Sequence, residues 1–221
     1  MNRRRERGQS ITEFLVTMLG FGLLLLGLFQ ALLFYRAKSA VDYAAMEAAR
    51  AGAVHGASKS SMQDGLARGL APLYATAAAN PGKAGAALAF VDAKKDVLLG
   101  MAKIEVLAPT RAAWNGLRKK QYDNKDALPN DSLYFRDASS AGVSVQDANV
   151  LKIRVTYDYP LIVPVIDRML AAFQTFGGPA KRDLIRSATS GRTVYSLPIQ
   201  STAMVRLQSP VTDSNNLASG P

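Results

Sequence analysis

Gly8, Gln9 and Glu13 near the N-terminus have side-chain types and a spacing that suit cleavage of the chain. The new terminal amine could then pair with a carboxylate. Gly8 has no side chain to obstruct a protease, and it directly follows the basic segment 1–7. A cut after Gly8 makes Gln9 the new N-terminus and Glu13 the fifth residue of the shortened chain. The new α-ammonium, with an ordinary pKa near about 7.7, then lies about one helical turn from the Glu13 carboxylate. These residues predict a proteolytic processing site.

The residues that follow Glu13 form a long apolar run that must position this site. From Phe14 to Tyr35 the run contains no ionisable side chain except the terminal tyrosine. A hydrocarbon core of about 30 Å requires roughly 20 helical residues, so the run is long enough to cross a membrane. The alternative is a buried helix of a soluble domain, but such helices are usually shorter and amphipathic. We therefore expect a transmembrane segment at about 14–35.

Glu13 is costly at the edge of this run. An isolated charge inside lipid costs roughly 2.5–3.5 kcal/mol on insertion scales. An ammonium on a neighbouring helix would offset much of that cost and fix the axial stagger between the two helices. The alternative is an acid in the first helical turn, favourable to the helix dipole and wetted by lipid headgroups. Glu13 alone favours that alternative, whereas Gly8, the basic leader and the apolar run together favour the pairing hypothesis.

Basic residues on the two sides of the run predict the orientation of the chain. The leader carries Arg3, Arg4, Arg5 and Arg7, whereas Arg36 and Lys38 follow the run. The excess of arginine on the first side places the N-terminus in the cytoplasm by the positive-inside rule. Everything after about residue 35 is then expected outside.

The remaining charge does not indicate a nucleic-acid-binding protein. The formal net charge is +10, but the basic residues are scattered, and the densest patch is Arg118–Lys120. A basic surface can meet anionic lipid or nucleic acid; a solvated surface with surplus lysine and arginine is the interpretation we prefer. The chain has no cysteine, so no disulfide holds its outer part together.

The helical pattern continues beyond the apolar run. Residues 36–57 are rich in alanine and contain no proline, which predicts one helix from about residue 10 to residue 53. A stripe of small residues follows one narrow face of it and consists of Ala40, Ala44, Ala48 and Ala51. Small residues at this spacing allow close packing, either by a neighbouring helix or by the sheet of the same chain.

The rest of the chain predicts an α+β domain. A second helix is expected to close at Asn80–Gly82, and a short one to begin after Thr110 with Trp114 in the core. Residues 150–159 alternate apolar and polar, as in an antiparallel sheet with one buried face. Two short strands are expected on either side of Pro198. The expected organisation is a leader at 1–8, a long helix at 9–57, an α+β domain at 58–210 and a polar, frayed tail at 211–221.

The N-terminal motif resembles the processing site of type IV prepilins. Gly8, four further residues and then Glu13-Phe14 are similar to the form of this site in the tight-adherence (Tad, or Flp) pilus system. Residues 45–57, AMEAARAGAVHGA, resemble the alanine-arginine helix of TadE-like minor pilins. Four further segments of this chain are similar to segments of the longer TadE-like proteins: GLAPLYA, LPNDSLYF, QDANVLKIRVTYDYPLIVPV and LPIQSTAMVRLQSPV.

This resemblance implies a role in pilus assembly. A prepilin peptidase would cut between Gly8 and Gln9, and the mature minor pilin or pseudopilin would take part in assembly or priming of the fibre. Its implied partners are the peptidase, other Tad pilins, the inner-membrane assembly platform and the lipid bilayer. The implied location is the bacterial inner membrane, with a periplasmic C-terminal domain. The absence of cysteine departs from relatives that have a disulfide in the outer domain.

Residues for other chemistry are sparse. His55 is the only histidine and lies in a predicted helix among alanines and glycines, so we expect neither a histidine-based triad nor a multi-histidine zinc site. Oxygen ligands suited to calcium gather in one loop, at Asp123, Asn124, Asp126, Asn130 and Asp131. Their spacing does not match an EF-hand, and such residues also form turns. We expect no enzymatic activity, cofactor or metal; the alternative function is an uncleaved, membrane-anchored binding or adhesion module.

Overall fold

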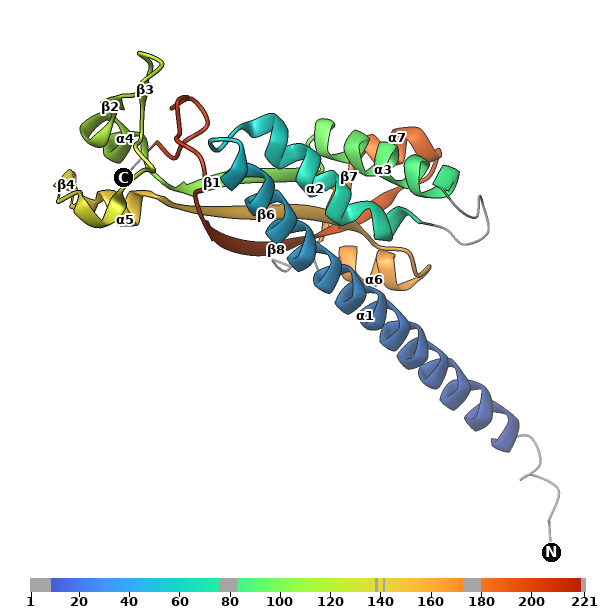
Figure 1. Ribbon diagram of the computed structural model, residues 1–221. Helices are drawn as coiled ribbons and strands as arrows, with labels where there is room; N and C mark the ends of the chain where they lie inside the picture. Colours follow the sequence, from blue (N-terminus) through green and yellow to red (C-terminus); the bar gives the residue numbers. More distant parts are fainter. Residues whose placement is uncertain (1–8, 76–82, 138, 141, 173–179, 220–221) are drawn as a thin grey trace, which may run out of the picture. The chain divides into compact units, whose positions relative to one another are not determined.

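The computed structural model of the chain divides into two compact units (Figure 1). The first unit comprises the described residues up to Arg36 together with those from Tyr159 to Pro198. The second unit comprises Ala37–Asp158 and the described residues from Ile199 onward. The residues that the structure describes are 9–75, 83–137, 139–140, 142–172 and 180–219.

One helix, α1 (Gln9–Val54), forms the whole N-terminal part of the described chain. It contains no proline and is rich in leucine and alanine, which favour helix. It ends where Gly56 and Ala57 both adopt a φ of +59°, and the Ala57 amide donates to the Gly52 carbonyl at 2.8 Å. Left-handed residues of this kind commonly end helices. The predicted continuous helix is therefore confirmed.

Two further helices, α2 (Lys59–Tyr74) and α3 (Lys83–Leu98), pack against each other in the second unit (Figure 1). Helix α3 was not predicted from the sequence. Its signal is a stripe spaced by four residues: Ala89, Ala93 and Val97 are only 0–4% exposed. The segment expected to close α2, residues 80–82, lies outside the described residues.

The main sheet has the strand order β1-β6-β8-β7. Its strands are β1 (Ala102–Ala108), β6 (Val150–Pro160), β7 (Lys181–Asp183) and β8 (Val194–Arg206). In the second unit β1 pairs antiparallel with β6, from Ala102↔Tyr157 to Ala108↔Lys152. In the first unit β7 pairs antiparallel with β8, from Lys181↔Ser196 to Asp183↔Val194. The α+β class with an antiparallel sheet is confirmed.

Strand β6 supplies much of the core of the second unit. Its side chains Leu151, Ile153, Val155 and Tyr157 are at most 2% exposed, as the alternating pattern predicted. The expected short helix is α4 (Arg111–Leu117), where the Thr110 hydroxyl accepts a hydrogen bond from the Ala113 amide at 3.2 Å. Trp114 is buried there, and its indole nitrogen donates to the Val211 carbonyl at 2.8 Å. Thr110 and Trp114 therefore lie as predicted.

Short elements occupy the polar, turn-rich stretch between α4 and β6. They are β2 (Lys119–Lys120), β3 (Asp126–Ala127), η1 (Leu133–Phe135), β4 (Ser139–Ser140), β5 (Val143–Ser144) and α5 (Val145–Ala148). The fully buried Asn149 connects this region, because its side-chain nitrogen donates to the carbonyls of Pro129 and Val145 at 2.9 and 2.8 Å. Its backbone carbonyl also accepts from the Leu207 amide at 2.8 Å.

Two short helices complete the first unit, α6 (Ile166–Ala172) and α7 (Leu184–Ser190). Asp183 caps α7, since its carboxylate accepts a hydrogen bond from the Arg186 amide at 2.9 Å. The same carboxylate pairs with the Arg186 guanidinium at 3.2 Å. Helix α6 begins two residues after Pro164.

Two expectations are wrong. Strand β8 continues as a single strand through Pro198 and does not form two short strands. Proline cannot donate a hydrogen bond to a neighbouring strand, and it is tolerated at this position because β7 pairs only with residues 194–196. The C-terminal tail is not frayed as far as residue 219. Val211 and Leu217 are only 0% and 4% exposed, and Arg111 donates its backbone amide to the Ala218 carbonyl at 2.8 Å. Apolar residues spaced along a polar tail therefore hold it on the second unit.

Candidate membrane and assembly interface

From Ile11 to Phe21, α1 exposes apolar side chains in every direction. Successive helical residues are about 100° apart, so an exposed run of residues covers the whole circumference. The large apolar residues at 39–73% exposure are Ile11, Phe14, Leu15, Val16, Met18, Leu19, Phe21, Leu24, Leu25, Leu28 and Phe29. A helix that is apolar all round belongs in lipid or among other apolar helices. In the described part of the chain, α1 alone is long and apolar enough to cross a membrane by length and composition.

The predicted processing residues lie at or just before the start of α1. Gln9 is the first residue of the helix, and Glu13 and Phe14 are exposed one turn later. The Thr17 hydroxyl donates to the Glu13 backbone carbonyl at 2.8 Å. Across the described residues, no hydrogen bond or ion pair reaches the Glu13 carboxylate. Gly8 lies outside the described residues, as do Arg3, Arg4, Arg5 and Arg7 and the side chain of Gln9.

Gln30 is a site residue that the sequence analysis missed. It is only 4% exposed, and its side-chain oxygen accepts hydrogen bonds from the Ile162 and Val163 amides at 3.3 and 3.0 Å. One turn later the Phe34 ring meets the Tyr159 ring edge-on, with centroids 6.2 Å apart. The available signal was that Gln30 is the only amide side chain between residues 14 and 35. The helix is therefore joined to residues 159–163 by a buried polar contact.

The second half of α1 is packed within its own chain. Of the predicted stripe, Ala44 and Ala48 are 0% exposed, while Ala40 and Ala51 are half-buried. A β-carbon on Gly69 of α2 would lie 2.7 Å from the Ala44 β-carbon, and one on Gly65 would lie 3.0 Å from the Ala48 α-carbon. Small residues on both helices thus allow the backbones to approach closely. The helix that packs against Ala44 and Ala48 is α2 of the same chain.

A charged contact accompanies this packing on the second unit. The Lys38 ammonium lies 2.5 Å from the Asp42 carboxylate and donates to the Gln200 carbonyl at 2.9 Å. Partial burial raises the pKa of the Asp42 carboxyl, but hydrogen bonds from Lys38 and Ser201 outweigh it and leave the pKa below its usual value. This contact is half exposed and joins α1 to β8.

A buried hydroxyl network joins α2, α3 and β6. The Tyr74 hydroxyl donates to the Asp96 carboxylate and lies 2.9 Å from the Tyr157 hydroxyl. Burial, followed by the neighbouring Tyr157 and Asp96, raises the pKa of Tyr74 well above its ordinary value. The neutral hydroxyl is therefore the form that the fold requires. This part-buried network holds three elements together.

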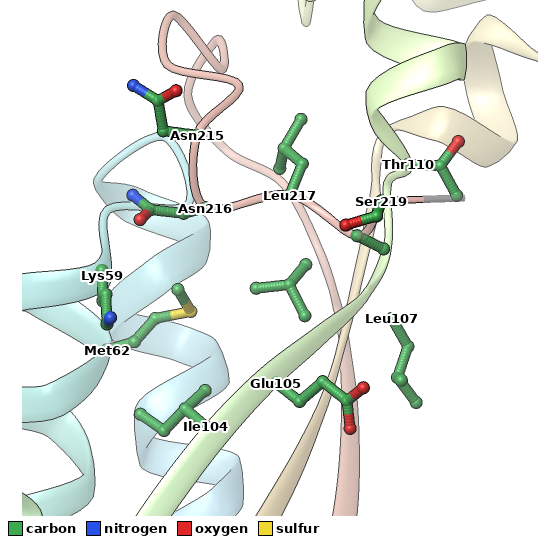
Figure 2. Close-up of a pocket in the computed structure, with 12 residues that line it drawn as sticks. Lys59, Met62, Ile104, Glu105, Leu107, Thr110, Asn215, Asn216, Leu217 and Ser219 are labelled. Carbon is green, nitrogen blue, oxygen red and sulfur yellow. The ribbon is translucent and has the colours of Figure 1, made fainter. Parts of the chain in front are cut away.

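The cavity in Figure 2 lies in the second unit and has a volume of about 530 Å³. Lys59 and Met62 of α2 lie on one side of it, and Glu105 and Leu107 of β1 lie on another (Figure 2). The C-terminal segment 215–219 closes it further. Its lining contains no histidine and no cysteine.

The acidic loop considered for calcium makes other contacts. The Asp131 carboxylate accepts two hydrogen bonds from the Arg136 guanidinium, both at 2.8 Å, and Asn130 donates to the Leu207 carbonyl at 2.7 Å. Asp123 lies 3.8 Å from the Lys125 ammonium, and Asn124 adopts a turn with φ of +65°. Within the described ranges, no three histidine, cysteine, aspartate or glutamate side chains are grouped to hold a metal. His55 is exposed, with its δ nitrogen 2.8 Å from the Ala51 carbonyl.

The architecture is thus a long apolar helix, of the kind found in a membrane anchor or a signal sequence, that continues into an α+β domain. Residues 8–50 match the model of the TadE-like protein family. This match confirms the TadE-like resemblance over residues 8–50, which include the apolar run and most of the rest of α1. Comparison with the curated proteins gives no match, and comparison with the solved structures gives none either.

Proposed function

We propose that this chain is a minor pilin or pseudopilin that takes part in assembly or priming of the Tad (Flp) pilus after cleavage between Gly8 and Gln9. Two observations together carry the proposal. The TadE-like match covers residues 8–50, and α1 exposes apolar side chains in every direction between Ile11 and Phe21. A helix with such a surface needs lipid before assembly and other apolar helices after it.

The proposed topology places residues 1–8 in the cytoplasm and about 14–35 in the inner membrane. The α+β domain, residues 58–210, and the segment 211–221 are then periplasmic. The four arginines of the leader support this orientation. The 46 residues of α1 support it as well, because a span of about 20 residues leaves the second half of the helix outside the lipid.

Glu13 is proposed to set the register between subunits. The exposed position of its side chain on α1 leaves the carboxylate accessible to a group from a neighbouring helix. The α-ammonium that cleavage creates at Gln9 is the proposed partner, either in the same chain or in the next. Pairing in a medium of low dielectric is stronger than in water, so the acid favours the assembled state.

The proposed partners follow from the surfaces of α1. Other Tad pilins would contact the exposed first half, because Ala44 and Ala48 are already buried within the chain. A prepilin peptidase would act on residues 8 and 9, and the assembly platform would receive the processed subunit. The proposed role is packing and recognition, without catalysis.

Mass measurement of the membrane-extracted protein tests the processing step. In cells that contain the pilus peptidase, we expect a chain that begins at Gln9. An intact Met1 in those cells would contradict the proposal and favour the uncleaved binding module. Gly8→Leu should leave an uncut precursor in the membrane, because a bulky side chain obstructs the protease.

The role of Glu13 needs a different measurement. Glu13→Ala should be cut as the wild type is, yet enter pili poorly, as quantified in sheared surface fractions. Glu6→Ala is the matched control, because Glu6 is an acid that leaves with the leader. Equal pilus content in both variants would refute the register role while leaving the processing step intact.

A further inference from the structure

The first unit contains a cavity of about 630 Å³ lined by both cationic and apolar side chains. Arg168 of α6 and Arg192 before β8 supply two guanidinium groups. Ile162, Pro164 and Val165 supply apolar surface, and Asp167 contributes the only carboxylate in the lining. A guanidinium is suited to phosphate because it presents several N–H donors in a planar fork. The lining is therefore chemically suited to an anionic group attached to an apolar one.

Arg168 and Arg192 differ from the nearby Arg186, whose guanidinium is already in an ion pair. Arg186 is paired with Asp183 at 3.2 Å and is largely buried. Arg168 and Arg192 are exposed, and no salt bridge to either is found among the described residues. Asp167 accepts a hydrogen bond from the Arg168 backbone amide at 2.7 Å. From residue 159 to residue 198 there are five basic and two acidic side chains, a net charge of +3.

The apolar edge of this cavity points to a lipid-facing position. Ile162 and Val165 are 53% and 49% exposed, and Met169, on the following turn of α6, is 42% exposed. Val165 has a φ of +73°, a conformation that a β-branched residue rarely adopts. Such strain persists only where the surrounding structure holds it, and here it directs the chain from Pro164 into α6.

Gln30 fixes the position of this edge along α1. Its side-chain oxygen accepts from the Ile162 and Val163 amides, within the first unit. Gln30 is five residues before Tyr35, or about 7–8 Å along the helix axis. The start of the cavity lining therefore lies beside the last turns of the apolar run, which in the proposed orientation form the outer end of the span.

We propose that this cavity binds the headgroup of an anionic phospholipid in the outer leaflet. Arg168 and Arg192 contact the phosphodiester, while Ile162 and Val165 lie at the boundary between headgroups and acyl chains. This inference rests on the proposed membrane orientation. A bound lipid would hold the first unit against the bilayer surface and would have to be released when the subunit leaves the membrane.

Native mass spectrometry of the full-length, processed protein in detergent tests the proposal. The probes are phosphatidylglycerol and phosphatidylcholine with the same acyl chains. We expect a clear preference for phosphatidylglycerol, which Arg168→Gln and Arg192→Gln each weaken by roughly fivefold, the contribution of one basic residue near an anionic surface. Arg68→Gln with Arg206→Gln is the matched control, because both arginines are exposed in the second unit.

A second measurement does not depend on affinity in detergent. Since the chain has no cysteine, Ile162→Cys provides a single site for an environment-sensitive fluorophore. In nanodiscs, the emission should shift to the blue when phosphatidylglycerol is present, and Arg168→Gln with Arg192→Gln should abolish that shift. The fluorophore also reports whether the double variant keeps the local fold in pure phosphatidylcholine.

The outcomes separate this proposal from the proposed function. Equal binding of the two lipids, or an unchanged preference in the double variant, would overturn the lipid site. Competition by free glycerol 3-phosphate at the same concentration would also overturn it, because the cavity would then recognise phosphate without the lipid. An uncut chain that still prefers phosphatidylglycerol would contradict the processing step and leave the lipid site standing.

Discussion

The two halves of α1 share one continuous helix but differ in what surrounds them. Between Ile11 and Phe21 the large apolar side chains are all exposed, whereas Val41, Ala44 and Ala48 are 0% exposed. The glycines show the same contrast. A β-carbon on Gly20, Gly22 or Gly27 would meet nothing within 4 Å, whereas on Gly52 it would lie 2.7 Å from the Met62 side chain.

This difference shows that the two halves of α1 are constrained in different ways. The second half is fixed by the fold of its own chain, so its residues are constrained by internal packing. Much of the first half is not covered by other described parts of the chain. Its residues are therefore constrained by the lipid or the other molecules that contact the helix. Substitutions in the second half should therefore change the stability of the protein, and those in the first half should change its assembly.

The largest effect is expected from a paired set of glycine substitutions. Gly69→Leu should lower the free energy of unfolding of the second unit by about 3 kcal/mol, because the new side chain would collide with the Ala44 backbone. Gly27→Leu should leave that free energy within about 0.5 kcal/mol of wild type, since its surroundings are open. Pulse proteolysis of the detergent-solubilised full chain in urea measures both. Equal destabilisation would break the comparison between the two halves.

Tyr74→Phe should have the next largest effect. Removal of the hydroxyl deprives Asp96 and Tyr157 of a buried hydrogen-bond partner, so the second unit should lose about 1–3 kcal/mol. Burial raises the pKa of Tyr74 in the folded state. Because an unfolded tyrosine releases its proton near about pH 10, wild-type stability should fall as the pH rises beyond that value. The phenylalanine variant should show a weaker fall, as measured by urea unfolding at pH 8 and 10.5.

Gln30→Leu tests the polar contact of the first unit. Loss of the two hydrogen bonds leaves the Ile162 and Val163 amides unpaired, which should cost about 1–2 kcal/mol locally. Hydrogen exchange at these two amides should become faster by about tenfold or more. Leu33→Gln is a useful control, since it adds an amide to the same turn region without the partner amides. Unchanged exchange in Gln30→Leu would show that the contact does not hold the segment.

The smallest effect is expected from the Lys38–Asp42 pair. The folded pKa of Asp42 is lower than its unfolded value, so its contribution is present above about pH 4 and is lost as the pH falls through the folded pKa. The pair is half exposed, so Asp42→Asn should cost about 0.5 kcal/mol or less near neutral pH. Urea unfolding at pH 7 and pH 3 measures this, and an equal loss at both pH values would contradict the linkage.

Features that depend on local pattern were predictable from the sequence. The continuity of α1 follows from alanine, leucine and the absence of proline, and the strand β6 follows from strict alternation. The helix α3 was missed because its buried stripe consists of small residues that resemble a generic alanine-rich stretch. The single strand β8 was missed because tolerance of Pro198 depends on where β7 ends, which local pattern does not reveal.

The residues proposed for function divide in the same way. Glu13 and Phe14 could be proposed from the sequence because the pattern that singles them out lies within a few residues of Gly8, and their role in processing stays a prediction. Gln30 was missed because its partners, Ile162 and Val163, are 132 and 133 residues away in the chain. Arg168 and Arg192 were also missed as a pair, since only the fold places them around one cavity. The role of Ala44 and Ala48 depended likewise on Gly65 and Gly69 of another helix.

The Gln30 contact also sets an order of events during biosynthesis. The helix emerges from the ribosome long before residues 162 and 163 are made, so the Gln30 side chain is made without those partners. Only a chain that has been completed as far as this segment, and folded, can satisfy the Gln30 oxygen. A prematurely terminated chain would lack both hydrogen bonds to that oxygen, whereas the Gln30 side-chain nitrogen has no partner among the described residues even in the folded chain.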